Sequence, residues 1–64
     1  MTERQTELAA ALAHHRAVYV RWQRDQASDG ELRTTEVAAR RLGATDAQIR
    51  EAEAAARIRQ EPMP

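Results

Sequence analysis

The feature that most limits this chain is its small supply of large apolar side chains. Of its 64 residues, 27 are hydrophobic, but 14 of those are alanines and two are methionines near the ends. Eleven sizeable apolar side chains remain, a thin core for a domain near the lower size limit for independent folding. Burying one such side chain stabilises a fold by roughly 2 kcal/mol, whereas ordering one residue costs about 1.5 kcal/mol. We therefore expect one small domain that depends on a partner or on self-association.

The residue types predict an all-α fold. Good helix formers dominate, and strand formers never alternate over a useful length. The glycines and prolines are confined to Gly30, Gly43, Pro62 and Pro64. The pattern predicts a single helical domain over residues 1–61, with a long N-terminal helix, a short helix and a third helix, followed by a disordered tail over 62–64.

The first predicted helix runs from about Thr2 to about Ala27 and is capped by Thr2 or Thr6. Its apolar seam follows helical spacing and consists of Leu8, Leu12, His15, Tyr19 and Trp22. A weaker second face carries alanines and Val20. This second face suggests contact with another chain, although a single exposed valine is also ordinary.

Turn and cap residues place the next two helices. Ser28-Asp29-Gly30 indicates a turn in which Gly30 takes the left-handed conformation that ends a helix. A short helix is then expected from Thr34-Thr35-Glu36 to about Leu42, with Val37, Ala38 and Leu42 facing inward.

The third helix is expected after Gly43, which ends the second. Thr45 caps it and Gln48 completes a capping box. The helix should reach about Gln60. Its inner stripe is Ile49, Ala52 and Ala56, and Ile58 lies on the opposite side.

The segment around Gly43 combines a small residue, an apolar residue, a turn glycine, a cap and a β-branched anchor. These are Ala39, Leu42, Gly43, Thr45 and Ile49. Two helices that cross steeply need a small residue at the crossing and a turn that tolerates positive φ. Over about residues 34–53 the chain resembles the helix-turn-helix unit of small MerR-like and excisionase-like regulators of bacteria and phages.

The resemblance implies a DNA-binding regulator that acts as a dimer, with the third helix in the major groove. Gln48 would read adenine, and Arg50 would read guanine or hold a phosphate. The implied DNA-binding residues are Arg33, Arg40, Arg41, Thr45, Gln48 and Arg50.

A helical protein–protein interaction module with no nucleic-acid partner is the alternative, such as an adaptor, an antitoxin-like or inhibitor-like protein, or an assembly subunit. The thin core, the second apolar faces and the balance of ten arginines against ten acids favour it. The candidate contact residues are Tyr19, Val20, Trp22 and Ile58. Under both hypotheses we expect a homo-oligomer.

Other classes of function are disfavoured. The chain has no cysteine or lysine and a single serine, so no nucleophile–base pair is evident and we expect no enzyme. His14 and His15 are adjacent and diverge by about 100° on a helix, which prevents shared metal chelation. His15 should be a hydrogen-bonded core or interface residue, with a pH-sensitive contact as the alternative. We expect a cytoplasmic protein without signal peptide, membrane span, cofactor or small-molecule substrate.

Overall fold

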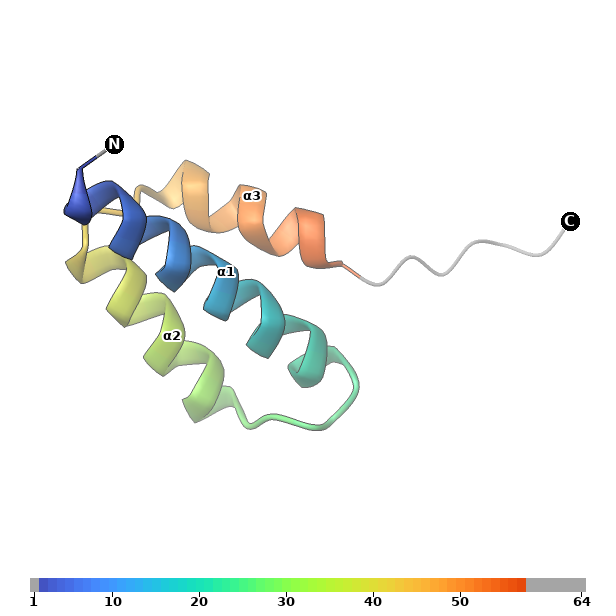
Figure 1. The fold of residues 1–64 in the computed structure, drawn as a ribbon. Helices are drawn as coiled ribbons and strands as arrows, with labels where there is room; N and C mark the ends of the chain where they lie inside the picture. Colours follow the sequence, from blue (N-terminus) through green and yellow to red (C-terminus); the bar gives the residue numbers. More distant parts are fainter. Residues whose placement is uncertain (1, 58–64) are drawn as a thin grey trace, which may run out of the picture.

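The computed structural model describes residues 2–57, which form three helices with no strand among them (Figure 1). Helix α1 spans Glu3–Gln23, α2 spans Asp29–Arg41 and α3 spans Asp46–Ala56. Helix α1 lies between the other two, with α2 antiparallel to it and α3 returning in its direction (Figure 1). The predicted all-α fold, with a long N-terminal helix and two shorter ones, is confirmed.

All three helices begin at a hydroxyl-bearing cap. Thr2 forms a capping box with Gln5 at the start of α1, and Thr45 forms one with Gln48 at the start of α3. At the start of α2, the Ser28 hydroxyl accepts a 3.1 Å hydrogen bond from the backbone N–H of Glu31. These bonds satisfy amide groups that have no partner inside the helix.

Two predicted boundaries are wrong, because the tripeptide Ser28-Asp29-Gly30 begins a helix instead of ending one. Helix α1 stops at Gln23, and Asp25 takes the left-handed conformation with φ 59°. The backbone N–H of Gln26 then donates to the Arg21 carbonyl at 2.7 Å, which is the closing bond of a Schellman motif. Helix α2 therefore starts at Asp29, five residues before Thr34.

Helix α2 ends as predicted at a left-handed Gly43, whose φ is 103°. The N–H of Ala44 donates to the Ala39 carbonyl at 3.0 Å, so a second Schellman motif closes this helix. Helix α3 ends at Ala56, before the predicted Gln60, and Arg57 is extended. The predicted tail and Ile58 lie outside the described residues.

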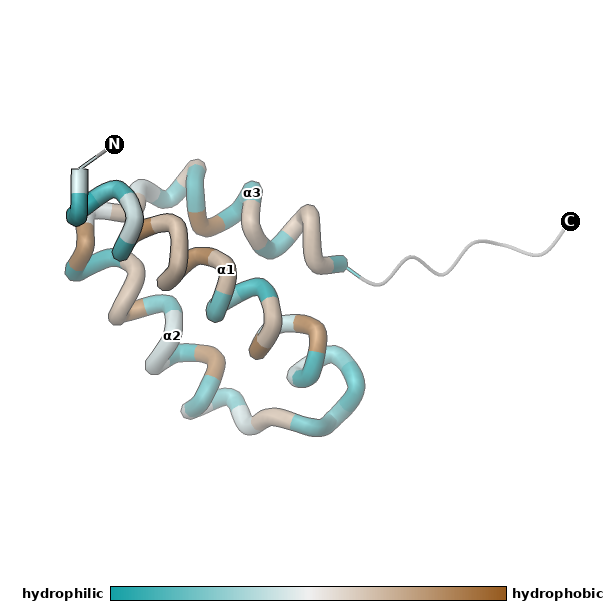
Figure 2. Tube along the Cα trace, in the orientation of Figure 1, coloured by the Kyte–Doolittle hydropathy of each residue, from teal (hydrophilic) through white to brown (hydrophobic). Residues whose placement is uncertain are grey.

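The core is small and rich in alanine. Among the described residues, the buried apolar side chains are Val18, Ala39, Ala44, Ile49 and Ala52. Leu8, Ala11 and Leu12 of α1 pack against the cluster of Ala39, Ala44 and Ile49. Figure 2 shows hydrophobic segments along all three helices and a largely hydrophilic connection between α1 and α2.

The predicted inner face of α2 is partly wrong. Ala39 is fully buried and Leu42 is half-buried, but Val37 and Ala38 are exposed. The buried stripe follows the spacing of Leu32, Thr35, Ala39 and Leu42, and Val37 and Ala38 lie off that stripe. On α3 the predicted stripe is confirmed: Ile49 and Ala52 are buried and Ala56 is half-buried.

Within residues 2–57, none of the three helices combines the length and the hydropathy that crossing a lipid bilayer requires.

Candidate functional site

The residues of the helix-turn-helix resemblance come together around the Gly43 turn. Ala39 and Ile49 are buried in one cluster, and the cap at Thr45 starts α3. The local geometry of this turn therefore agrees with the prediction. Helices α2 and α3, however, pack mainly against α1 and diverge on either side of it (Figure 1). The turn is used to place two helices on a third.

The capping box occupies two of the predicted DNA-binding residues, Thr45 and Gln48. The Gln48 backbone N–H donates to the Thr45 hydroxyl at 3.1 Å, and the Thr45 N–H donates to the Gln48 side-chain oxygen at 2.9 Å. A glutamine reads adenine with both its amide oxygen and its amide nitrogen. Bidentate readout by Gln48 therefore requires the capping box to open.

Arg40 is also occupied. Its guanidinium lies 3.5 Å from the Glu36 carboxylate and donates a hydrogen bond to Asp46 at the start of α3. This hydrogen bond holds the pKa of the Asp46 carboxyl below its ordinary value of 3.8 and raises the pKa of Arg40. All three side chains are at the surface. The triad links α2 to α3 and neutralises Arg40.

The other predicted DNA-contacting arginines remain available. Arg33, Arg41 and Arg50 are exposed, and none forms an ion pair with another residue of 2–57. Arg33 and Arg41 line the same shallow hollow on α2, whereas Arg50 lies on α3. The structure thus joins two of the four predicted arginines in one surface feature.

The predicted contact residues of α1 cluster at its C-terminal end. The rings of Tyr19 and Trp22 lie with centroids 5.5 Å apart. Trp22 is 36% exposed, and Tyr19 and Val20 are half-buried. Because they are partly covered and partly open, these aromatic rings both stabilise the fold and remain accessible to a partner.

A surface feature that the sequence reasoning missed lies between α1 and α2. A hollow of about 400 Å³ with mostly apolar walls lies over Ala10, Ala11, His14, Thr34, Thr35 and Ala38. The hollow of about 380 Å³ on the other side of Thr34 and Ala38 includes Val37, which is 37% exposed. We call the surface formed by Ala10, His14, Thr34, Val37 and Ala38 the hairpin face.

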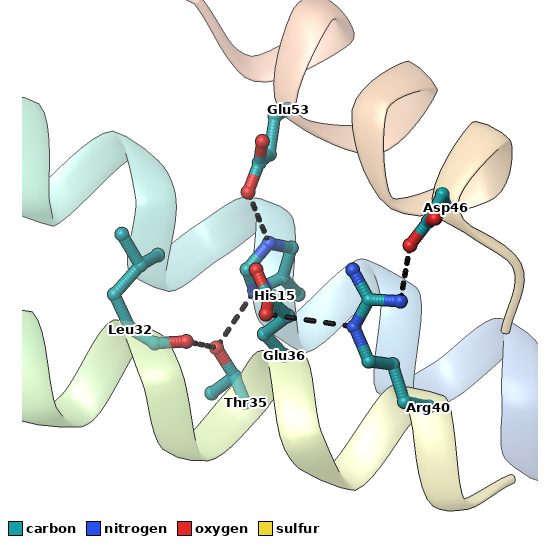
Figure 3. Close-up of polar contacts among 7 residues, drawn as sticks. All are labelled: His15, Leu32, Thr35, Glu36, Arg40, Asp46 and Glu53. Carbon is teal, nitrogen blue, oxygen red and sulfur yellow. Dashed lines mark hydrogen bonds and ion pairs between the residues drawn. The ribbon is translucent and has the colours of Figure 1, made fainter.

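The strongest polar feature is His15, which is completely buried in the middle of α1. Its Nδ1 lies 2.8 Å from the Thr35 hydroxyl of α2, and its Nε2 lies 2.9 Å from the Glu53 carboxylate of α3 (Figure 3). The predicted hydrogen-bonded core histidine is therefore confirmed. Its two partners stand 20 and 38 residues further along the chain, and no local pattern identified them.

Comparisons with protein-family models, curated proteins and solved structures found no match to this chain.

Proposed function

We propose that this protein is a helical interaction module that acts as a homodimer, and that two copies associate through the hairpin face. One observation carries the proposal. The exposed face of α1 carries alanines on either side of His14 at its centre and opposite charges at its two ends, so the face complements itself when it is turned around.

The apolar part of this face needs a cover. Among residues 2–57 the large buried apolar side chains are Val18 and Ile49, so leaving Val37 37% exposed in the wall of a hollow is a costly use of apolar surface. Alanine and threonine at the hollows allow another helix to approach closely, and Val37 can fill a hollow of the partner. In an isologous two-fold contact, Val37 of each copy meets a hollow of the other, so one surface supplies both halves of the contact.

The charges along α1 select a second copy as the partner. At helical spacing the outer stripe of α1 reads Glu3, Glu7, Ala10, His14, Ala17 and Arg21. Glu3 and Glu7 are exposed and form no ion pair among the described residues. Two antiparallel α1 helices that cross at His14 bring Glu7 of each copy beside Arg21 of the other. Arg21 also lies 3.8 Å from Glu31 and donates to the Gln26 carbonyl at 3.0 Å, but both contacts are exposed, so its guanidinium can take part in a further contact.

Analytical ultracentrifugation tests the proposal. We expect a species of twice 7.2 kDa whose population rises with protein concentration. The two-fold dimer contains two contacts between Glu7 of one copy and Arg21 of the other. Glu7→Arg and Arg21→Glu should each weaken the dimer, because each variant places two side chains of the same charge against each other at both contacts. The double variant should restore the dimer. Glu51→Arg, an exposed reversal on α3, is the matched control and should have no effect.

A monomer at millimolar concentration would overturn the proposal. Failure of the double variant to recover, with helicity intact, would overturn the assigned face. Ala38→Glu tests the apolar part, because a buried unpaired carboxylate opposes association. A folded Ala38→Glu chain that still dimerises would also contradict the assigned face.

A second candidate function is DNA binding by a small regulator. It is favoured by the turn of Gly43, Thr45 and Ile49 and by three exposed arginines, Arg33, Arg41 and Arg50, that form no ion pair within residues 2–57. Fluorescence anisotropy with labelled duplex DNA at several salt concentrations tests it. DNA binding should weaken steeply with salt, whereas the apolar dimer contact persists. Lack of binding at low salt, or sequence-selective binding unchanged in Gln48→Ala and Arg50→Ala, would contradict the base-reading role.

A further inference from the structure

His14 is a side chain of a metal-binding type that the fold itself does not use. The chain has two histidines and no cysteine. His15 is buried, and both of its ring nitrogens have partners inside the chain. His14 is exposed, and its side chain forms no hydrogen bond or ion pair with another residue of 2–57. Its ring nitrogens are therefore open to a ligand from outside the chain.

The proposed dimer brings a second imidazole to the same place. On the outer stripe of α1, His14 lies midway between Glu7 and Arg21, about 10 Å from each along the helix axis. When Glu7 of each copy lies beside Arg21 of the other, the two-fold axis passes at His14. The two His14 side chains then lie next to each other at the axis. The flanking pairs of Glu7 and Arg21 cancel in charge, so a cation between the imidazoles meets no net charge from them.

The surroundings of His14 leave its ring free to turn toward that axis. His14 lines the hollow of about 400 Å³ between α1 and α2, and the other side chains of this hollow are alanines and threonines. None of them carries a charge that would repel a cation. The ring can therefore change its rotamer without breaking a contact with a charged group of its own chain.

We propose that the two His14 side chains of the dimer bind one divalent transition-metal ion at the two-fold axis. Imidazole nitrogen suits Zn²⁺, Ni²⁺ and Cu²⁺, whereas Mg²⁺ and Ca²⁺ prefer oxygen ligands. Within residues 2–57 of a single chain, no three potential ligands stand together. The site is thus incomplete without the second copy, and it rests on the proposed dimer. Water fills the remaining coordination positions.

A metal ion at the axis stabilises the dimer, because one copy alone supplies only one imidazole. With one ion for each dimer, the association constant rises by a factor of one plus the ratio of free metal to its dissociation constant. Free Zn²⁺ at ten times that constant should therefore strengthen association about tenfold. Cu²⁺ should act at lower concentration than Zn²⁺, and Mg²⁺ should have no effect.

Analytical ultracentrifugation in Zn²⁺ and in EDTA tests the site. The ratio of the two association constants should be about ten in the original protein and about one in His14→Gln. Because His14 also belongs to the hairpin face, each variant is compared with itself in EDTA. The double variant His14→Gln/Glu51→His is the matched control. It keeps one exposed histidine in each chain but moves it to α3, and its ratio should also be about one.

Two further readouts count the ligands. Isothermal titration calorimetry should give one Zn²⁺ for two chains, and electron paramagnetic resonance of the Cu²⁺ complex should show nitrogen couplings from two equivalent imidazoles. One Zn²⁺ for each chain, a single imidazole on Cu²⁺, or a Zn²⁺ effect that persists in His14→Gln would overturn the metal site.

The same data separate this inference from the proposed dimer. A dimer that forms in EDTA and does not respond to Zn²⁺ would overturn the metal site alone. A monomer at millimolar concentration in both EDTA and Zn²⁺ would overturn the dimer and the site together.

Discussion

The indole Nε1 of Trp22 donates a 2.6 Å hydrogen bond to Oδ1 of Asp29, linking the end of α1 to the first residue of α2. The bond spans a turn in which Asp25 is left-handed and the Gln26 carbonyl accepts from the Arg21 side chain at 3.0 Å. The direction of α2 is thus set by side chains on both sides of the turn, without a glycine.

Replacing Asp29 by alanine should lower the free energy of unfolding by about 1 kcal/mol, since the indole loses its acceptor. Asp29→Asn keeps an oxygen at that position and should lose less. Trp22 is the single tryptophan of the chain, so its fluorescence reports the same event. We expect a red shift in Asp29→Ala alone. Equal stability and equal spectra for both variants would contradict the role of this bond.

The two glycines should respond to alanine in opposite directions. Gly43 has φ 103°, a conformation that strains an L side chain, so Gly43→Ala should destabilise the protein by about 1 kcal/mol or more. Gly30 lies in the first turn of α2, where an added Cβ would meet only the Ser28 hydroxyl at 3.7 Å. Gly30→Ala should therefore stabilise by up to about 1 kcal/mol. Thermal unfolding of both variants measures the difference, and effects of the same sign would contradict this assignment.

The Asp46 carboxyl should titrate below its ordinary pKa of 3.8, because Arg40 donates a hydrogen bond to its charged form. A carboxyl whose pKa is lower in the folded state adds stability above 3.8, and that stability is lost as pH falls through the lowered value. Arg40→Gln should move the pKa back toward 3.8, while Arg41→Gln, the exposed neighbour, should leave it low. Carboxyl-carbon NMR titration measures this, and identical titration in the two variants would exclude Arg40 as the cause.

Where local chemistry decides, the fold was predictable. The end of α2 is predicted by Gly43, and the capping box of α3 is predicted by Thr45 and Gln48. The structure contains both. The start of α2 was misjudged because Ser28-Asp29-Gly30 is compatible with either a turn or a helix cap. The choice depends on Asp25 accepting positive φ, which few residues other than glycine do, although aspartate is among those that tolerate it.

The candidate site was predictable only in part. His15 on an apolar seam indicated a hydrogen-bonded histidine, but its partners on α2 and α3 depend on how those helices pack. Gln48 illustrates the opposite problem: the same residue fits a capping box and an adenine contact, and its bond to the Thr45 N–H favours the first. Val37 lies outside instead of inside, because the stripe toward α1 passes through Thr35 and Ala39, and the small or polar side chains of that stripe gave no apolar signal for it.

Helices α2 and α3 pack mainly on α1 and diverge from their shared turn. Away from that turn, a change in α2 can be balanced by a change on one side of α1, and a change in α3 by a change on another. Relatives of this chain should therefore covary in two sets. The sets meet at the turn, where Ala39 and Ile49 share one cluster and Arg40 binds Asp46, and at His15, whose ring contacts both helices.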